Sequence, residues 1–414
     1  MNTQDKRPSD IVIVGAARTA VGKFNGALSA LSAPELGAVA VQTAVSRSGI
    51  NPETIYEVIM GNVVSAGVGQ APARQAAIKG GLPDTVGATT INKVCGSSLK
   101  AVMMAANGIA AGEGDVFVAG GMESMTNTPY FLPKARQGLR YGHGELKDAL
   151  LHDGLWCAFQ DWGMGNAAEF IGKQFEISRQ EMDEFALRSH ERAAAATARG
   201  DFEAEIAPIE LKSRKGTTIF NRDESIRAEF SNGDYEIGTS LAQLAKLPPA
   251  FEQDGKVTAG NAPGLNDGGS AVVVTSRAEA ERQGVRPMAR IVGYTHTAVD
   301  PQWIFAAPAR AIPRLLARLD WSLDDVDLIE LNEAFAAQVL ANGAELSQKG
   351  YNWDWDKVNV NGGAIALGHP LGATGTKLLV TLLYALQNRS LKRGIAALCL
   401  GGGEAVALAV EMAQ

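Results

Sequence analysis

Cysteine, histidine and aromatic residues are scarce in this chain. Its 414 residues include three cysteines and five histidines, and aromatic residues make up 6% of the sequence. An odd number of widely separated cysteines provides no disulfide framework, so we expect free thiols in a reducing compartment, the cytoplasm. We assign no residue as a metal ligand.

Long hydrophobic runs and an excess of basic charge are also missing. The longest apolar runs, such as 11–14 and 378–380, are far shorter than a membrane span, and we expect no membrane association. The first ten residues hold several charges and no apolar core, which predicts no secretory signal. The formal net charge of −7 argues against a nucleic acid as partner.

Glycine, by contrast, is abundant and clustered. The 46 glycines are about 11% of the chain, against a usual share of roughly 7%, and they gather at a few turns. Glycine allows tight turns and close approach of the backbone to a ligand. The glycine-rich turns are therefore where we look for reactive side chains.

Cys95 lies in one of these turns. A short β-like run, 88–91, precedes it, and an amphipathic helix follows it, with apolar residues at helical spacing from Leu99 to Ile109. The unpaired N–H groups and the dipole of a helix N-terminus stabilise a thiolate, so we expect Cys95 to ionise easily and to be reactive. The alternative is a buried, inert cysteine. The Gly-Ser-Ser turn after it favours reactivity, because small residues let a substrate approach the sulfur.

The second half of the chain repeats the first at an offset of roughly 270–280 residues. Alternating strands and helices predict an α/β fold with two mostly parallel or mixed sheets. Among these elements we predict helices over 34–49 and 179–199, and a strand over 115–119 that ends in Gly120-Gly121. An irregular stretch between the halves could cover a site. We divide the chain into an N-terminal half (1–121 and 251–276), a loop domain (122–250) and a C-terminal half (277–414). The segments that repeat are 11–15 with 289–293, 57–62 with 327–332, 92–96 with 359–363 and 118–121 with 397–402.

Three further polar or reactive groups lie in turns of the second half: Asn332, His369 and Cys399. Ligands bind beyond strand ends in α/β folds, so these groups can converge on Cys95 if the two halves face each other. Taken singly, they are also explained as a turn residue, a helix cap and a small residue at a strand end. Their joint occurrence in glycine-rich motifs favours a site.

Together these groups suit thioester chemistry. A thiolate at Cys95 accepts an acyl group from a thioester, and His369 can take its proton. Cys399 can remove a proton from the carbon next to a thioester carbonyl. Backbone N–H groups, His369 and a water held by Asn332 can stabilise the oxyanion or enolate. Acyl transfer and deprotonation together make or break a carbon–carbon bond.

Four motifs stand in order along the chain: Asn92-x-Val94-Cys95-Gly96-Ser97-Ser98, 332–338, 362–370 and Cys399-x-Gly401-Gly402-Gly403. They resemble the motifs of the thiolase family, in particular the acetyl-CoA acetyltransferase and 3-ketoacyl-CoA thiolase group, over about 11–411. The resemblance implies a duplicated five-layer αβαβα fold with an inserted loop domain, and homodimers or homotetramers. It also implies acyl-CoA and CoA as small-molecule substrates and no tightly bound cofactor.

The resemblance implies a role for each residue. Cys95 would be the acylated nucleophile, His369 its activator and oxyanion partner, and Asn332 the holder of a catalytic water. Cys399 would be the acid and base of the second step, and the backbone N–H groups of Cys95 and Gly401 would form a second oxyanion site. Arg227 would contact the nucleotide of coenzyme A. The pantetheine and the acyl chain would pass along Phe251, Ala259, Met164 and Phe335.

Four departures from the family pattern suggest an altered acyl pocket or carrier mode. Gly163 replaces a histidine typical of biosynthetic members, and Pro263 replaces a serine whose hydroxyl contacts pantetheine. An insertion with several acidic residues follows Arg227, at 228–240. Glu404-Ala405 replaces the usual residues after the glycine triplet.

Two other interpretations stay open from the residues alone. Cys95, His369 and Asn332 would also suit a thioester hydrolase, which would release free acid. A non-catalytic protein that binds CoA or lipid would keep the fold but lose the nucleophile or the acid and base. All four groups are present in this chain, which favours the acyltransferase.

Overall fold

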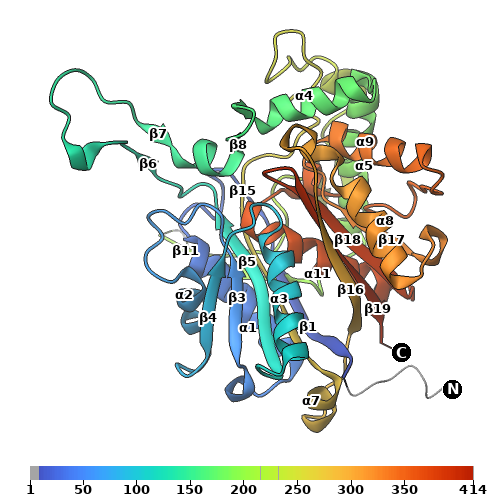
Figure 1. Cartoon of the computed structure of the whole chain (residues 1–414). Helices are drawn as coiled ribbons and strands as arrows, with labels where there is room; N and C mark the ends of the chain where they lie inside the picture. The colour runs from blue at the N-terminus through green and yellow to red at the C-terminus, as the bar shows by residue number, and fades with distance from the viewer. Residues whose placement is uncertain (1–8, 215, 232, 414) are drawn as a thin grey trace.

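The computed structural model describes residues 9–214, 216–231 and 233–413. Most of the N-terminal segment for which the sequence predicts no secretory signal lies outside these residues. The described chain is an α/β structure around a large mixed sheet, with helices on its faces (Figure 1).

The main sheet contains eleven strands among the described residues. Two short strands lie off its main path: β10 (Ile206–Ala207) pairs with β1, and β2 (Gly22–Lys23) pairs with β15. In spatial order the other strands are β17 (Leu328–Leu331), β18 (Arg393–Leu400), β19 (Glu404–Met412), β16 (Ala289–Ala298), β1 (Ile11–Thr19), β15 (Asn266–Ser276), β5 (Val116–Ser124), β3 (Glu57–Gly61) and β4 (Gly87–Ile91).

The topology repeats itself about the centre of this sheet. In the first half β3 runs parallel to β5, and β15 is antiparallel to both β5 and β1. In the second half β17 runs parallel to β18, and β19 is antiparallel to both β18 and β16. Among the described residues, the half-sheets join where Val12 and Ile13 of β1 face Arg290 and Ala289 of β16. The duplication predicted from the sequence is therefore confirmed.

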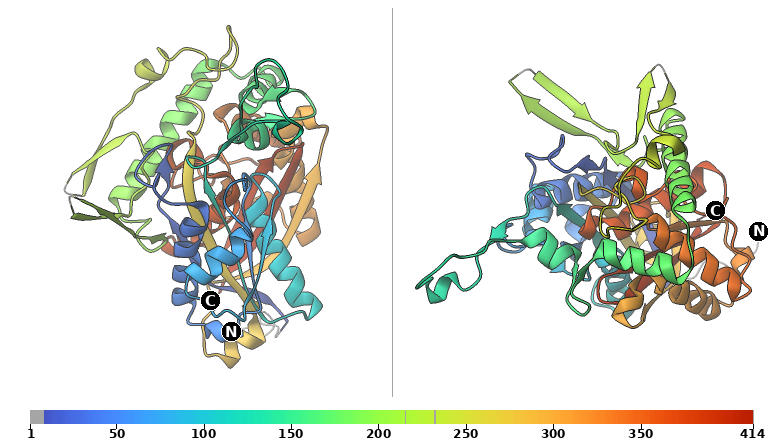
Figure 2. Two further views of the ribbon diagram at one scale, coloured as in Figure 1. Left: turned by 90° about the vertical axis from the view of Figure 1, so that its left-hand side faces the viewer. Right: turned by 90° about the horizontal axis from the view of Figure 1, so that it is seen from above.

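Helices form the remaining layers. Two helices lie between the half-sheets and pack against each other, and the outer face of each half-sheet carries its own helices (Figures 1 and 2). The layers thus alternate as αβαβα, in agreement with the expected fold. The central helices are α3 (Ser97–Ala111) and α11 (Thr374–Asn388), and the outer ones are α1 (Ala33–Ser48), α2 (Pro72–Lys79), α8 (Pro308–Leu319) and α9 (Ala336–Gln348).

The central layer explains the apolar character of its helices. Residues 374–386 of α11 are all buried. Among the described residues, one helical segment, Val94–Ala111, is long and apolar enough by length and composition to cross a membrane. In the fold it is α3 with its preceding turn, and 56% of it is buried inside the protein.

The sequence pattern predicts that β5 ends in Gly120-Gly121, and this prediction is wrong. The strand continues to Ser124. The two glycines are needed inside it because other backbone segments approach closely: a Cβ at Gly120 would lie 2.1 Å from the Ser270 oxygen, and one at Gly121 would lie 1.9 Å from the Gly372 oxygen.

The stretch between the halves is an excursion of helices and small hairpins. The long loop between β6 and β7 projects away from the body, and the hairpins β11–β12 and β13–β14 project from another side (Figures 1 and 2). Its elements are β6 (Tyr130–Phe131), β7 (Lys147–Asp148), β8 (Trp156–Cys157), β9 (Trp162–Gly163), α4 (Met164–Gln174), α5 (Arg179–Ala198), β11 (Ile209–Ser213), β12 (Gly216–Phe220), β13 (Ala228–Ser231), β14 (Asp234–Ile237) and α6 (Leu241–Leu244).

Short helical turns complete the described chain. They are η2 (Pro52–Thr54), η3 (Ala135–Gln137), η4 (Leu150–Leu155), α7 (Arg277–Arg282), η5 (Pro301–Ala306), η6 (Leu323–Asp325), α10 (Ala364–Leu367) and η7 (Leu371–Ala373).

Candidate active site

Cys95 is held in a strained turn between β4 and α3. Val94, directly before it, has a φ of +46°, a left-handed conformation that is rare for a β-branched residue. The turn is over-determined by hydrogen bonds: Val94 N–H donates to Asn92 Oδ1 at 2.9 Å, and Ser97 Oγ donates to the Val94 oxygen at 2.6 Å. The sequence therefore fixes the Cys95 backbone just ahead of the helix.

The thiol of Cys95 is not the easily ionised group that the sequence predicts. Burial raises its pKa to about 12, against hydrogen bonds from the backbone N–H groups of Cys95 and Gly401, which lower it. The expectation of a helix-stabilised thiolate is wrong because desolvation outweighs the partial charges at the helix start. The sulfur consequently needs a base to take its proton. The two N–H groups that reach it are those the sequence assigns to an oxyanion site.

His369 is arranged to be that base. Its Nδ1 lies 2.6 Å from Thr374 Oγ1, whose own proton goes to the Pro370 oxygen at 2.8 Å. Nδ1 therefore carries the proton, and the Nε2 lone pair is left to accept one. Burial, with a contribution from the positive charge of Lys377, lowers the pKa of His369 to about 3, so the ring is neutral.

Asn332 follows β17 and lies beside the histidine. Its Nδ2 is 3.4 Å from His369 Nε2, and the side chain is completely buried. Among the described residues, no group pairs with its Oδ1. An unpaired buried carbonyl is costly, so this oxygen suits a bound water or a polar hydrogen of a substrate.

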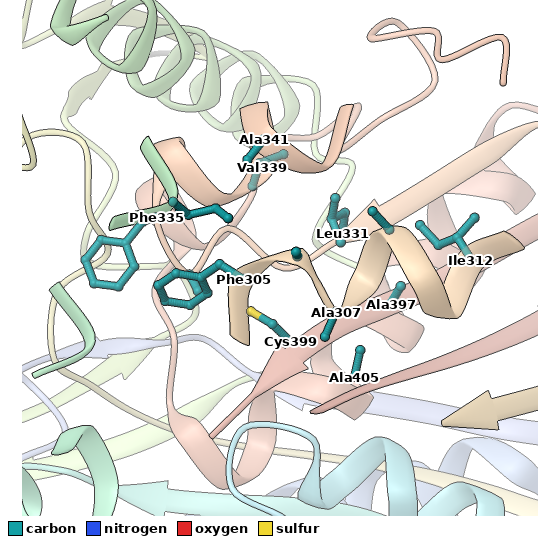
Figure 3. Packing of buried hydrophobic residues seen from close by; sticks show 14 of the residues in the cluster. Phe305, Ala307, Ile312, Leu331, Phe335, Val339, Ala341, Ala397, Cys399 and Ala405 are labelled. Atoms are coloured by element: carbon teal, nitrogen blue, oxygen red, sulfur yellow. The ribbon is translucent and has the colours of Figure 1, made fainter. Parts of the chain in front are cut away.

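Cys399 lies near the end of β18, against a tightly packed hydrophobic cluster. Figure 3 shows its side chain close to Phe305 and Ala307 of the C-terminal half. Burial raises the pKa of Cys399 well above its ordinary value, and the neighbouring Cys95 raises it further. Since the two sulfurs disfavour each other's charge, they would carry a negative charge in turn and not together.

One cavity of about 310 Å³ brings most of the predicted site residues together. Its walls come from both halves and from the excursion, including Trp156 and Gly163. The predicted site residues that line it are Cys95, His369, Cys399, Gly401, Met164, Phe251, Pro263 and Phe335. Another cavity, of about 330 Å³ between 197 and 223, contains none of the predicted site residues.

Asn332, Arg227 and Ala259 lie outside the lining of this cavity, and the last two meet each other. The Arg227 guanidinium donates to the Ala259 oxygen at 2.9 Å, which brings together the two residues expected along the CoA path. The acidic insertion after Arg227 forms the β13–β14 hairpin, where Glu229 faces Glu236 across the strands. Glu404, another departure, forms an ion pair with Lys93 of the nucleophile turn.

Sequence reasoning missed two residues that hold His369. Thr374 fixes its tautomer, and Asn266 Oδ1 accepts the His369 backbone N–H at 2.9 Å. Thr374 offered one signal, a hydroxyl at the start of a helix just after the Gly-His-Pro turn. Asn266 offered none, because its partner is 103 residues away.

Among the described residues, no group of three or more His, Cys, Asp or Glu side chains is arranged to hold a metal ion. The arrangement instead offers two thiols, a neutral imidazole and two backbone N–H groups around an apolar cavity, with the unpaired amide oxygen of Asn332 beside the imidazole. Such a set can take up an acyl group, stabilise negative oxygen and move protons.

Comparisons with known proteins agree with this chemistry. The thiolase N-terminal domain model matches residues 11–278, and the thiolase C-terminal domain model matches residues 285–412. The chain is 50% identical to acetyl-CoA acetyltransferase of Cupriavidus necator, over 97% of this chain and 99% of that protein, and 48% identical to that of Escherichia coli, over 97% and 98%. The crystal structure of the Bacillus anthracis acetyl-CoA acetyltransferase covers 98% of this chain and 99% of its own, at 44% identity and a TM-score of 0.92. The chain therefore belongs to the thiolase family.

Proposed function

We propose that this thiolase-family acyltransferase is an acetyl-CoA C-acyltransferase, which moves acyl groups between coenzyme A thioesters through an acyl-enzyme on Cys95. The observation that carries the proposal is that Cys95, Cys399 and a neutral His369 line one apolar cavity. The same set serves Claisen condensation and, in reverse, thiolytic cleavage of a 3-ketoacyl-CoA.

In the first half-reaction His369 Nε2 takes the proton of Cys95 as the sulfur attacks the thioester carbonyl. The pKa values of about 12 and about 3 keep both groups neutral beforehand, so proton transfer accompanies the attack. The N–H groups of Cys95 and Gly401 receive the oxyanion. The bond from carbonyl carbon to CoA sulfur then breaks, and the CoA thiolate leaves with the proton of Cys399.

In the second half-reaction Cys399 is the base. Its thiolate takes a proton from the carbon next to the carbonyl of a second acetyl-CoA. The protonated His369 and a water on Asn332 stabilise the enolate oxygen. The carbon attacks the acyl group on Cys95, a carbon–carbon bond forms, and the departing Cys95 sulfur recovers its proton from His369.

We propose acyl-CoA and CoA as the small-molecule partners, without a nucleic acid, a membrane or a tightly bound cofactor. A cytoplasmic role in fatty acid metabolism is consistent with the free thiols. A homodimer or homotetramer is supported by the projecting loop between β6 and β7, which exposes Leu139, Tyr141 and Leu146 (Figure 1).

The experiment that tests the function is peptide-resolved mass spectrometry after mixing the protein with acetyl-CoA and longer acyl-CoA thioesters. We expect an acyl adduct on Cys95 that Cys95→Ala abolishes. Cys399→Ala should keep the adduct and lose acetoacetyl-CoA formation. Release of free acid without a condensed product would favour a thioester hydrolase, and no adduct from any thioester would favour a CoA- or lipid-binding protein without turnover.

A further inference from the structure

Glu123, near the end of β5, is a completely buried carboxylate that the chemistry above does not use. Each of its two carboxylate oxygens accepts two hydrogen bonds. Oε1 accepts from Asn62 Nδ2 at 2.8 Å and from Val64 N–H at 3.2 Å. Oε2 accepts from Val63 N–H at 3.0 Å and from Gly372 N–H at 2.8 Å. Three of the donors come from the turn after β3, and the fourth comes from η7 in the other half of the chain.

Four donors favour the carboxylate form of this side chain, and burial opposes it. Burial raises the pKa of Glu123 to about 7, although the four hydrogen bonds lower it. A protonated acid would direct its own hydrogen at a donor, and so would the NH₂ group of a glutamine. Replacing Glu123 with glutamine therefore removes two of the four bonds and leaves two N–H groups without an acceptor.

A series of hydrogen bonds connects Glu123 to the turn that carries Cys95. Glu123 fixes the backbone of Val63, whose oxygen accepts a hydrogen bond from Asn92 Nδ2 at 3.2 Å. Asn92 Oδ1 in turn accepts the N–H of Val94, the strained residue next to Cys95. The left-handed turn that presents the thiol thus rests on the segment that Glu123 holds.

Another hydrogen bond connects Glu123 to the loop that carries His369, the proposed base. Gly372 lies in η7, between His369 and Thr374, so its anchor on Glu123 fixes the loop that carries the imidazole and its partner. The contact is close, because a Cβ at Gly372 would lie 2.8 Å from Glu123 Oε2 and 2.7 Å from the Met122 oxygen. The loop is therefore seated directly on β5 of the N-terminal half.

We propose that Glu123 is a positioning residue that sets the distance and orientation between Cys95 and His369 across the junction of the two halves. The proposal rests on the proposed function for the role of those two groups. Glu123 is not part of the cavity lining and does not touch a substrate in it. Its negative charge makes ionisation of Cys95 harder, so the carboxylate does not activate the thiol by its charge.

The test compares Glu123→Gln with the unmodified enzyme in two assays: single-turnover acylation of Cys95 by acetyl-CoA, and peptide-resolved alkylation of Cys95 by iodoacetamide across pH 6–9. We expect acylation to slow by about 100-fold with little change in KM, because misplacing reacting groups by 1 Å costs about that much. Alkylation should slow too, because His369 no longer meets the sulfur. If Glu123 acted only through its charge, alkylation of Cys95 would instead become faster in Glu123→Gln, since loss of the negative charge makes the thiol ionise more readily.

Glu330→Gln is the matched control. Glu330 is another buried carboxylate, 2% exposed on β17, and the charged side chains that act on it, those of Lys377, Glu333, Glu205 and Arg389, belong neither to the nucleophile turn nor to η7. This variant should acylate within about threefold of the unmodified enzyme. Glu123→Asp keeps a carboxylate with a shorter reach and should recover part of the rate that glutamine loses. A folded Glu123→Gln enzyme with acylation and alkylation rates like the unmodified one would overturn the proposal.

Asn92→Ala decides the matter if Glu123→Gln does not fold. Asn92 is exposed, so alanine there cuts the connection between Val63 and Val94 without disturbing the core. We expect slower acylation and alkylation with an unchanged melting temperature, and normal rates would overturn the proposal. Alkylation does not depend on a CoA substrate. If the unmodified protein is not acylated, the proposed function fails, and the alkylation rates still test the position of Cys95 and His369.

Discussion

Thr374 Oγ1 lies 2.6 Å from Nδ1 of His369 and donates its own proton to the Pro370 oxygen at 2.8 Å. The hydroxyl can therefore only accept from the imidazole, which puts the histidine proton on Nδ1. The reactive nitrogen, Nε2, is thereby kept as an acceptor on the side of the cavity.

Replacing Thr374 with valine should disrupt this arrangement without changing the shape of the side chain. We expect acylation of Cys95 to slow by about 10- to 100-fold, because the imidazole can then place its proton on either nitrogen. Stopped-flow acylation with acetyl-CoA measures the change. Thr374→Ser retains the hydroxyl and should stay within a few-fold of the unmodified rate. Equal rates for valine and threonine would contradict the tautomer argument.

Replacing Asn332 with alanine should affect the second half-reaction more than the first. The unpaired Oδ1 is available to hold a water at the enolate, whereas in the proposed mechanism the oxyanion of the first step would meet the N–H groups of Cys95 and Gly401, which reach the Cys95 sulfur. We expect condensation to slow by about 100-fold and acylation by less than tenfold. Rapid-quench measurement of the acyl-enzyme and of acetoacetyl-CoA separates the two steps. A variant slowed equally in both would count against a water held for the enolate.

Glu330 should make the stability of the protein depend on pH. Burial raises its pKa from 4.5 to about 8, so the folded state holds a proton that the unfolded state has released between these values. Its stabilising contribution is present below about pH 4.5 and is lost as the pH rises towards 8. Glu330→Gln lacks this loss, and its free energy of unfolding should gain about 3–4 kcal/mol on the unmodified protein between pH 5 and 8.

Urea unfolding of both proteins at each pH checks this expectation. Burial lowers the pKa of His190 and His369 to about 3, so these two groups lower the free energy of unfolding as the pH falls below about 6.5. Both proteins contain these histidines, so their contributions cancel in the difference between the two unfolding free energies. A constant difference in unfolding free energy across the range would show that Glu330 does not titrate with folding.

Gly163 should tune the acyl chain that the cavity accepts. Its φ of −76° suits any residue, and the nearest atoms to a Cβ there would be Asn166 Oδ1 at 3.4 Å and the Trp156 ring at 3.9 Å. Gly163→Leu is therefore expected to fold and to fill part of the cavity. We expect kcat/KM for a six-carbon acyl-CoA to fall about tenfold relative to acetyl-CoA.

Gly165 provides the contrast for this experiment. A Cβ there would lie 2.2 Å from the Phe251 ring, so Gly165→Ala should distort the cavity wall and lower activity towards acyl chains of every length. An unchanged chain-length profile in Gly163→Leu would show that the acyl group does not reach Gly163.

Cys95, His369 and Cys399 could be named from the sequence because each lies in a glycine-rich turn. Asn332, in a stretch without glycine, could be named because it directly follows a buried strand. Helices α1 and α5 could also be predicted. A proline in the first turn and a glycine after the last residue mark α1, and the helical spacing of apolar residues marks α5. β5 was cut short, because glycine inside a strand has the same local signature as glycine at a turn. Only the approach of Ser270 and Gly372 distinguishes the two.

The sequence by itself thus determined the repeated α/β units and the order of the candidate site residues along the chain. Tertiary structure decided how those side chains behave. The pKa of Cys95 depends on desolvation by distant segments, which outweighs the helix start next to it. The tautomer of His369 depends on Thr374, and Glu123 accepts hydrogen bonds from both halves of the chain, from the N–H groups of Val63 and Gly372, which are 60 and 249 residues away along the chain. Burial and long-range hydrogen bonds are properties of the packed chain, and local sequence patterns do not encode them.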